Sequence, residues 1–332
     1  VRALAAQVAV ANIAEPSRAT LLARLNNKVK DFDEAASMLL GVSADAVASD
    51  TEVVVGQEFD VTVSVWNRGT TKVILTGCEV DAPNGWTIQS VQLPKADPIA
   101  ANTAASVKVR VKLEANAAPT DAFDALPLTA TVSYTTDGNH VPLTISAAPE
   151  VGVVPAIALQ VNPGVGMIAA SGLPAERTFT VRVRNNTKAA VSGKVALSLP
   201  AGWTVAAGSP EPTFSLTREG EETSVGITVA IPTSAEPAKY ALSARAMWQG
   251  GESSIGYQTI SYDHIDTVRL MRDAVAQFSV VDVEIPAGLR IGYVDSGFDQ
   301  VWARLGELGL DVTLLSANDL LGDFSVYDTI VL

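Results

Sequence analysis

Residues 58–88, EFDVTVSVWNRGTTKVILTGCEVDAPNGWTI, decide the fold, because their first eight residues alternate between polar and apolar side chains. The apolar positions are Phe59, Val61, Val63 and Val65. In an extended chain such positions share one face, and the polar residues between them share the other. The same period recurs in SVKVRVKL, residues 106–113. Both stretches therefore predict half-buried antiparallel strands.

A second copy of this stretch, ERTFTVRVRNNTKAAVSGKVALSLPAGWTV, occupies residues 176–205. Asn67 and Asn185 are 118 residues apart, and Trp86 and Trp203 are 117 apart. An offset held this closely indicates an internal repeat. We therefore expect two tandem antiparallel β-sandwiches, at residues 47–150 and 151–262, each with about seven short strands.

Both repeats contain a P-x-G-W element, residues 83–86 and 200–203. It fits a turn followed by a tryptophan that closes one end of the sandwich, and a core role is favoured over a sugar-stacking role. Cys78 lies opposite Val195 in the repeat and has no basic neighbour in sequence, so a buried structural thiol is expected. As the only cysteine, it excludes an intramolecular disulfide.

Residues 1–46 are predicted to be helical, with the clearer helix running from about Pro16 to Leu40. Its apolar positions recur at spacings of three and four: Leu21, Leu22, Leu25, Val29, Phe32, Ala36 and Leu39. Such a stripe has to pack against another surface. The sequence predicts that this surface is either the next domain or a domain that precedes Val1.

Residues 263–287 are predicted to be a connector with extended stretches, and residues 288–332 to begin a doubly wound α/β domain. LRIGYV, DVTLLS and YDTIVL fit buried parallel strands, and FDQVWARLGELG fits a helix. Three such strands need further covering elements. We therefore expect this chain to be part of a longer protein, with a fold class that is multidomain and mainly β.

The formal net charge of -13 argues against broad binding to nucleic acids or anionic membranes. The basic residues Lys108, Arg110, Lys112, Arg182 and Arg184 lie on predicted strand faces. They are expected to be solvated or to dock against an acidic neighbour. No apolar run reaches the roughly 20 residues that a membrane-spanning helix needs.

The sequence offers few candidate metal-ligating, catalytic or ligand-binding residues. His140 lies in a polar turn, and His264 lies between Asp263 and Asp266, where neighbours seldom converge on one ion. We therefore predict no metal site and no catalytic residue. The turn DSGFD follows the first predicted parallel strand, where open α/β sheets bind ligands. Its ligand-binding candidates are Asp295, Ser296, Gly297 and Asp299; the alternative is that Asp295 or Ser296 caps the following helix.

The segment GLRIGYVDSGFDQVWARLGELGLDVTLLSANDLLGDFSVYDTIVL, residues 288–332, resembles the C-terminal region of large bacterial PIG-L (LmbE-like) deacetylases. The resemblance implies immunoglobulin-like, NEW3-like sandwiches and the start of a glutamine-amidotransferase-like domain. It also implies a zinc-dependent N-acetylglucosamine deacetylase domain upstream. The family's His-Pro-Asp-Asp motif has no match here, so this region is expected not to be an enzyme and to hold no cofactor itself.

Two functions follow. The first is an accessory region that positions the deacetylase domain, with an extracytoplasmic location implied by the resemblance. The second is a carbohydrate-binding or cell-surface module in which exposed aromatics stack on a glycan. The glycan-stacking candidates are Trp66, which is out of phase with the valines of its strand, and Trp248, which ends a strand.

Overall fold

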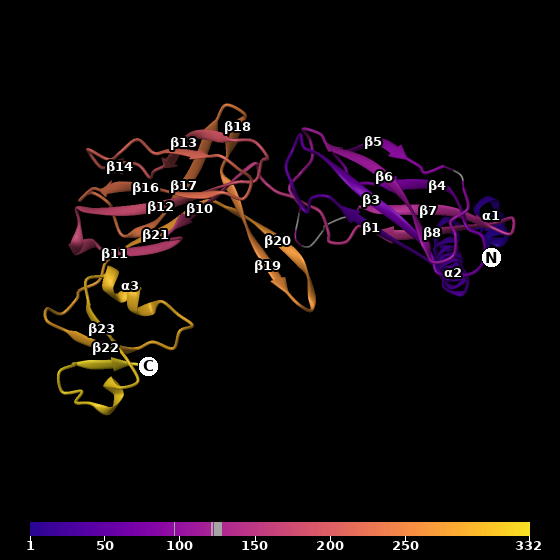
Figure 1. The fold of residues 1–332 in the computed structure, drawn as a ribbon. Coiled ribbons are helices and arrows are strands. Elements are labelled where there is room, and N and C mark those ends of the chain that lie inside the picture. Colours follow the sequence, from indigo (N-terminus) through magenta and orange to yellow (C-terminus); the bar gives the residue numbers. More distant parts are fainter. Residues whose placement is uncertain (96, 121, 123–127) are drawn as a thin grey trace. The chain divides into compact units, whose positions relative to one another are not determined.

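The computed structural model describes all residues except 96, 121 and 123–127 (Figure 1). Half of the chain is strand and 15% is helix, so the prediction of a mainly β protein is confirmed. The described chain divides into two compact units. The first contains Val1–Val154 and Thr259–Leu270, and the second contains Pro155–Gln258 and Met271–Leu332.

The first unit begins with helices α1 (Arg2–Val10) and α2 (Glu15–Leu40). One antiparallel sheet has the order β1 (Val42–Ala48), β3 (Glu58–Asn67), β6 (Thr103–Leu113) and β5 (Trp86–Gln92). The other has the order β4 (Ile74–Asp81), β7 (Thr129–Thr136) and β8 (Asn139–Ser146). The short strands β2 (Glu52–Val53) and β9 (Gly152–Val153) pair in parallel.

One hydrophobic core joins these two sheets, and the alternation in the sequence explains it. Val61, Val63 and Val65 on β3 are almost completely buried, whereas Asp60, Thr62 and Ser64 reach the outer face. Each buried valine removes apolar surface from water, which stabilises the fold by about 1.5 kcal/mol or more.

The C-terminal end of α2 is part of this unit. Ser37 is 2% exposed, and its hydroxyl lies 2.9 Å from the buried Tyr134 hydroxyl on β7. Ala36 and Leu40 pack against the same core. β1 begins at Val42, so the sandwich starts before the predicted boundary at residue 47. Only part of the expected apolar stripe is covered. Ala36 packs on the core, whereas Leu21, Phe32 and Leu39 are exposed.

The second unit repeats the first sheet as β10 (Ile157–Asn162), β12 (Ala175–Asn185), β16 (Glu222–Ile231) and β14 (Thr204–Val205). Its other sheet has the order β11 (Val165–Ala169), β21 (Val275–Val281), β17 (Ala238–Trp248), β13 (Val191–Ser198) and β15 (Thr213–Leu216). β18 (Gly251–Ser253) also pairs with β17, and β11 is parallel to β21. A 3-10 turn, η1, spans Ala170–Gly172.

The structure assigns residues 263–287 differently from the predicted connector. β18 and β21 pair with successive parts of β17, and between them the chain leaves as a hairpin, β19 (Ile255–Tyr262) and β20 (Ile265–Asp273). The Ala274 amide donates to the Ser254 carbonyl at 2.9 Å and closes the base of this hairpin. We call residues 255–273 the arm. Because Val275–Val281 completes a sheet of the second sandwich, that sandwich extends well past residue 262.

Residues 288–332 contain a three-stranded parallel sheet, in the order β23 (Asp311–Leu315), β22 (Arg290–Val294) and β24 (Thr329–Val331). Helix α3 (Val301–Glu307) lies between β22 and β23 in the chain, and a 3-10 turn, η2 (Asp319–Leu321), precedes β24 (Figure 1). Assignment of this segment to the doubly wound α/β class stays a prediction.

Candidate functional site

The DSGFD turn follows β22 and is stabilised by its own side chains. Asp295 Oδ1 accepts a hydrogen bond from the Gly297 amide at 2.8 Å. Asp299 Oδ1 accepts from the Tyr293 hydroxyl at 2.6 Å and from the Val301 amide at 3.1 Å. The hydrogen bond from Tyr293 holds the pKa of Asp299 below its usual range and raises the pKa of Tyr293 to about 12.

These contacts change the expected roles within the turn. The residue before α3 is Gln300, so neither Asp295 nor Ser296 is the helix cap, and Asp299 receives the Val301 amide instead. Ser296 lies 3.4 Å from Asp299, so this pair of candidates is close together. The carboxylates of Asp295 and Asp299 bind the turn's own donors, which is a structural role.

Trp66 lies on β3, in the first unit, and is 41% exposed. Its indole N–H donates to Asp45 Oδ1 on the neighbouring strand β1 at 3.2 Å. This hydrogen bond fixes the polar edge of the indole at the surface and leaves apolar ring area accessible.

Trp248 ends β17, in the second unit, and is half-buried against the second core. A Cβ at Gly250 would lie 2.7 Å from the Trp248 Nε1 atom, so the following turn covers this ring closely. The two glycan-stacking candidates therefore differ in exposure. Trp203 of the P-x-G-W element is 5% exposed and packs on Tyr240 and Phe278, at centroid distances of 5.0 and 5.7 Å.

The cysteine and the two histidines do not form a reactive thiolate or a metal site in the described part of the chain. Cys78 on β4 is partly buried against the first core, and burial raises its thiol pKa, which disfavours the thiolate. His140 and His264 are exposed. In the part of the chain that the structure describes, no three His, Cys, Asp or Glu side chains gather as a metal site. No helix of the described chain has the length and apolarity needed to span a membrane.

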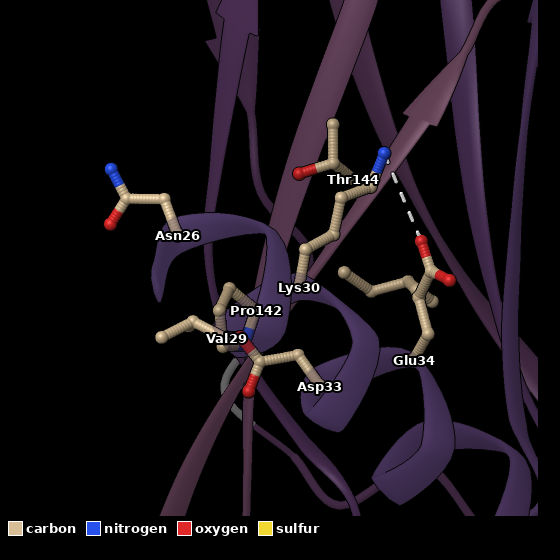
Figure 2. Close-up of a pocket in the computed structure, with 8 residues that line it drawn as sticks. Asn26, Val29, Lys30, Asp33, Glu34, Pro142 and Thr144 are labelled. Carbon is tan, nitrogen blue, oxygen red and sulfur yellow. Dashed lines mark ion pairs between the residues drawn. The ribbon is translucent and has the colours of Figure 1, made fainter. Parts of the chain in front are cut away.

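A groove between α2 and β8 was not anticipated by the sequence (Figure 2). Its volume is about 310 Å³. It is lined by Asn26, Val29, Lys30, Asp33, Glu34, Pro142, Leu143 and Thr144. Lys30 and Glu34, one helical turn apart, form an ion pair at 3.9 Å. Asp33 accepts a hydrogen bond from Arg2 of α1. The only signal in the sequence was this helical spacing, which is common on exposed helices.

The predicted basic faces are paired within their own sandwiches. Asp60 on β3 accepts from Arg110 on β6 and lies 3.2 Å from Lys108 Nζ. The Arg110 hydrogen bond holds the pKa of Asp60 below its usual range. In the second unit, Arg182 and Arg184 lie within 4 Å of Glu222 on the neighbouring strand. These surfaces are therefore locally neutralised and do not form a uniform basic patch.

Comparison with known proteins gives one family match. The model described as "NPCBM-associated, NEW3 domain of alpha-galactosidase" matches residues 39–135 and 174–249, more than half of the chain. The two matched segments contain Asn67 and Asn185, the landmarks of the internal repeat. No curated protein matches the chain.

Several solved structures are similar at low identity. The native alpha-2-macroglobulin of E. coli is 9% identical with a TM-score of 0.26, over 73% of this chain and 17% of that one. A titin structure, A168169, is 11% identical with a TM-score of 0.20, over 73% and 99%. A family 123 glycoside hydrolase from Clostridium perfringens is 13% identical with a TM-score of 0.23, over 49% and 33%. This chain thus spans less than two thirds of the macroglobulin and of the hydrolase.

Proposed function

Because the chain belongs to the family of NPCBM-associated NEW3 domains of alpha-galactosidase, we propose that it is a non-catalytic accessory region of a carbohydrate-active protein. The two sandwiches act as a scaffold, and the helices at their N-terminal side bind the catalytic domain. In the specific form that we favour, this domain is a zinc-dependent N-acetylglucosamine deacetylase of the PIG-L type. Its zinc and catalytic residues lie outside residues 1–332, and the parent protein is extracytoplasmic.

The observation that carries the proposal is an unpaired apolar face on α2. Leu21, Phe32 and Leu39 are spaced by eleven and seven residues, which places them on one side of a helix. They are 41%, 62% and 90% exposed. Next to this face, at the C-terminal end of the same helix, Ala36, Ser37 and Leu40 pack on the first sandwich. A helix that is anchored at its C-terminal end and exposes a row of large apolar side chains fits a mediator between a sandwich and a second domain.

The C-terminal segment is assigned a similar non-catalytic role. The parallel strands β22, β23 and β24 are the start of an amidotransferase-like domain whose remaining elements are further partners. Binding to nucleic acid is not part of the proposal, because the net charge is -13.

The test begins with the coding sequence on both sides of these residues. A His-Pro-Asp-Asp motif upstream supports the deacetylase form, and another hydrolase domain there supports only the broader accessory role. In the longer protein, Phe32→Glu is expected to expose the α2 face to proteolysis and to separate the catalytic domain from the sandwich. Asn27→Glu, which also adds one negative charge at an exposed position of the same helix, is the matched control. The absence of any catalytic domain in the parent protein would contradict the proposal.

A second candidate function is glycan binding by the sandwiches, favoured by the exposure of Trp66. Its indole is held by Asp45 with the ring at the surface. Trp66→Ala is expected to abolish a fluorescence shift on titration with N-acetylglucosamine oligomers, whereas Trp86→Phe, within the sandwich, is expected to retain it. No shift at millimolar sugar in the unmodified chain would contradict this function.

A further inference from the structure

The second sandwich has a pocket at the base of the arm. The arm interrupts a strand whose counterpart in the first sandwich, β8, is continuous. In the first unit, β7 and β8 pair continuously from Thr129↔Ser146 to Thr136↔Asn139. In the second, the corresponding pairing is divided between β18 and β21, and the arm is inserted between them. Insertions in a repeated scaffold are common places for binding residues, because the scaffold tolerates them and holds them rigidly.

The pocket has a small apolar part and a polar rim. Leu159 and Val161 on β10 line it, but their side chains lie in the second core and are at most 5% exposed, so the half-buried Val275 on β21 supplies accessible apolar area. The rim is polar: Gln160, Tyr257, Gln258, Arg272 and Asp273. The volume is about 540 Å³, which lies within the usual range for small-ligand sites.

The aromatic member of the rim is fixed in place. The Tyr257 hydroxyl donates to Asn186 Oδ1 at 3.1 Å, and Asn186 is itself 2% exposed and donates to the Pro155 carbonyl at 2.8 Å. The Arg184 guanidinium lies 5.9 Å from the Tyr257 ring centre. A ring held at its hydroxyl and on a face does not have to be ordered when a ligand binds, which lowers the entropic cost of binding.

Strand addition by a peptide is disfavoured at this pocket. β10 is an edge strand, but β19 lies directly against it, because a Cβ at Gly256 would be 2.1 Å from the Leu159 carbonyl oxygen. A peptide therefore cannot reach the backbone of β10 at this point in the manner of an added strand.

We propose that this pocket binds a neutral saccharide unit. Arg272 and Asp273 carry opposite charges, so the rim has no net charge to attract a phosphate. Two amides, a carboxylate and a guanidinium provide both donors and acceptors for neighbouring hydroxyl groups. Val275 and the Tyr257 ring, both half-buried, provide apolar area that suits the C–H face of a pyranose ring. The inference rests on the proposed function only in the choice of saccharides as the ligand class.

The test is calorimetric titration of the full 332-residue chain with triacetylchitotriose and, separately, with galactose. Arg272→Ala and Gln258→Ala remove exposed rim side chains and are expected to weaken binding by about tenfold or more each. Lys194→Ala and Gln277→Ala change exposed residues of the same sandwich outside the pocket and are expected to leave affinity unchanged. Unchanged thermal unfolding of the four variants shows that their folds are intact.

Three results would overturn the inference. One is no binding of either sugar at tens of millimolar. Another is binding that Trp66→Ala abolishes while both rim variants retain it, which places the site on the first sandwich. The last is equal weakening by the rim variants and their controls. Failure of the proposed function is separate, because a parent protein without a catalytic domain can still bind sugar here.

Discussion

Asn67 and Asn185 make the same kinds of hydrogen bond at the same point of the two sandwiches. Asn67 ends β3, Asn185 ends the corresponding strand β12, and each is at most 1% exposed. Each Nδ2 donates to the carbonyl four residues later and to a carbonyl on a distant loop, and each Oδ1 accepts the amide two residues later. A buried amide with these partners fixes the loop that leads to the opposite sheet.

We expect Asn67→Ala and Asn185→Ala each to lower the free energy of unfolding by about 1–3 kcal/mol, because buried carbonyl groups lose their donors. Denaturant titration followed by tryptophan fluorescence measures the change. The exposed helical Asn26 provides the control, and Asn26→Ala is expected to change stability by less than about 0.5 kcal/mol. Equal effects of all three substitutions would contradict a structural role for the two buried amides.

Asp60 is expected to make the stability of the first sandwich depend on pH. Its folded pKa lies below the unfolded value of about 3.9, because Arg110 donates to the carboxylate. The stabilisation is therefore present above about pH 4 and is lost as pH falls through the folded pKa. Asp60→Asn is expected to cost less than about 1 kcal/mol at pH 7, because the pair is near the surface, and less still at pH 2.5.

The corresponding positions in the second sandwich supply the control for this pH dependence. Thr178 and Thr228 occupy them, and their hydroxyls lie 2.9 Å apart. Thr178→Val is expected to have an effect that does not change between pH 2.5 and 7. A constant effect of Asp60→Asn over the same range would count against the ion pair as the cause.

Arg269 is expected to stabilise the first unit although it lies, in sequence, between two strands of the second sandwich. It is 8% exposed, its Nε donates to Glu52 Oε1 at 2.9 Å, and Gly152 lies against its guanidinium. Arg269→Met removes a hydrogen bond between charged groups and should cost about 1.5–3 kcal/mol. Arg245→Met breaks an exposed pair with Glu252 and should cost at most about 1 kcal/mol. If Arg269→Met and Arg245→Met lower the free energy of unfolding by similar amounts, in thermal or chemical unfolding, the result would argue against this role of Arg269.

Tyr293 is expected to ionise above the usual pH range of a phenol. The hydrogen bond to Asp299 stabilises the protonated phenol and raises its pKa to about 12, so this contribution to stability is present below about pH 10 and is lost as pH rises through 12. In an ultraviolet absorbance titration, Asp299→Asn should move one phenol toward pH 10. Tyr293→Phe should remove that transition. A titration curve unaffected by Asp299→Asn would contradict the assignment.

The local pattern of the strands was readable from the sequence, because burial on one face leaves a period of two. Val61, Val63 and Val65 are buried as predicted, and the NEW3 match confirms that part of the resemblance. The arm was not readable, since the strand that it interrupts is defined by the contact between Ser254 and Ala274. Arg269 resembles any surface cation in TVRLMRD, and only the folded chain reveals its burial.

Candidate sites were harder to predict than strands, because exposure and pocket shape depend on neighbours distant in sequence. The strand positions of Trp66 and Trp248 both fit exposed side chains. In the folded chain, however, the turn at Gly250 lies against the Trp248 ring, whereas Trp66 stays exposed. The pocket at the arm joins residues from β10 with residues about one hundred positions later. No local motif marks such a combination.

The different side chains at one pair of positions also affect how a duplicated chain avoids misfolding. Asp60 faces Arg110 in one sandwich, and Thr178 faces Thr228 in the other. If a refolding chain paired β3 with β16 in this register, Asp60 would face a threonine and lose its cation, and Arg110 would lose its carboxylate. Each strand therefore favours its own partner over the copy in the neighbouring repeat, which guards against strand exchange within one polypeptide.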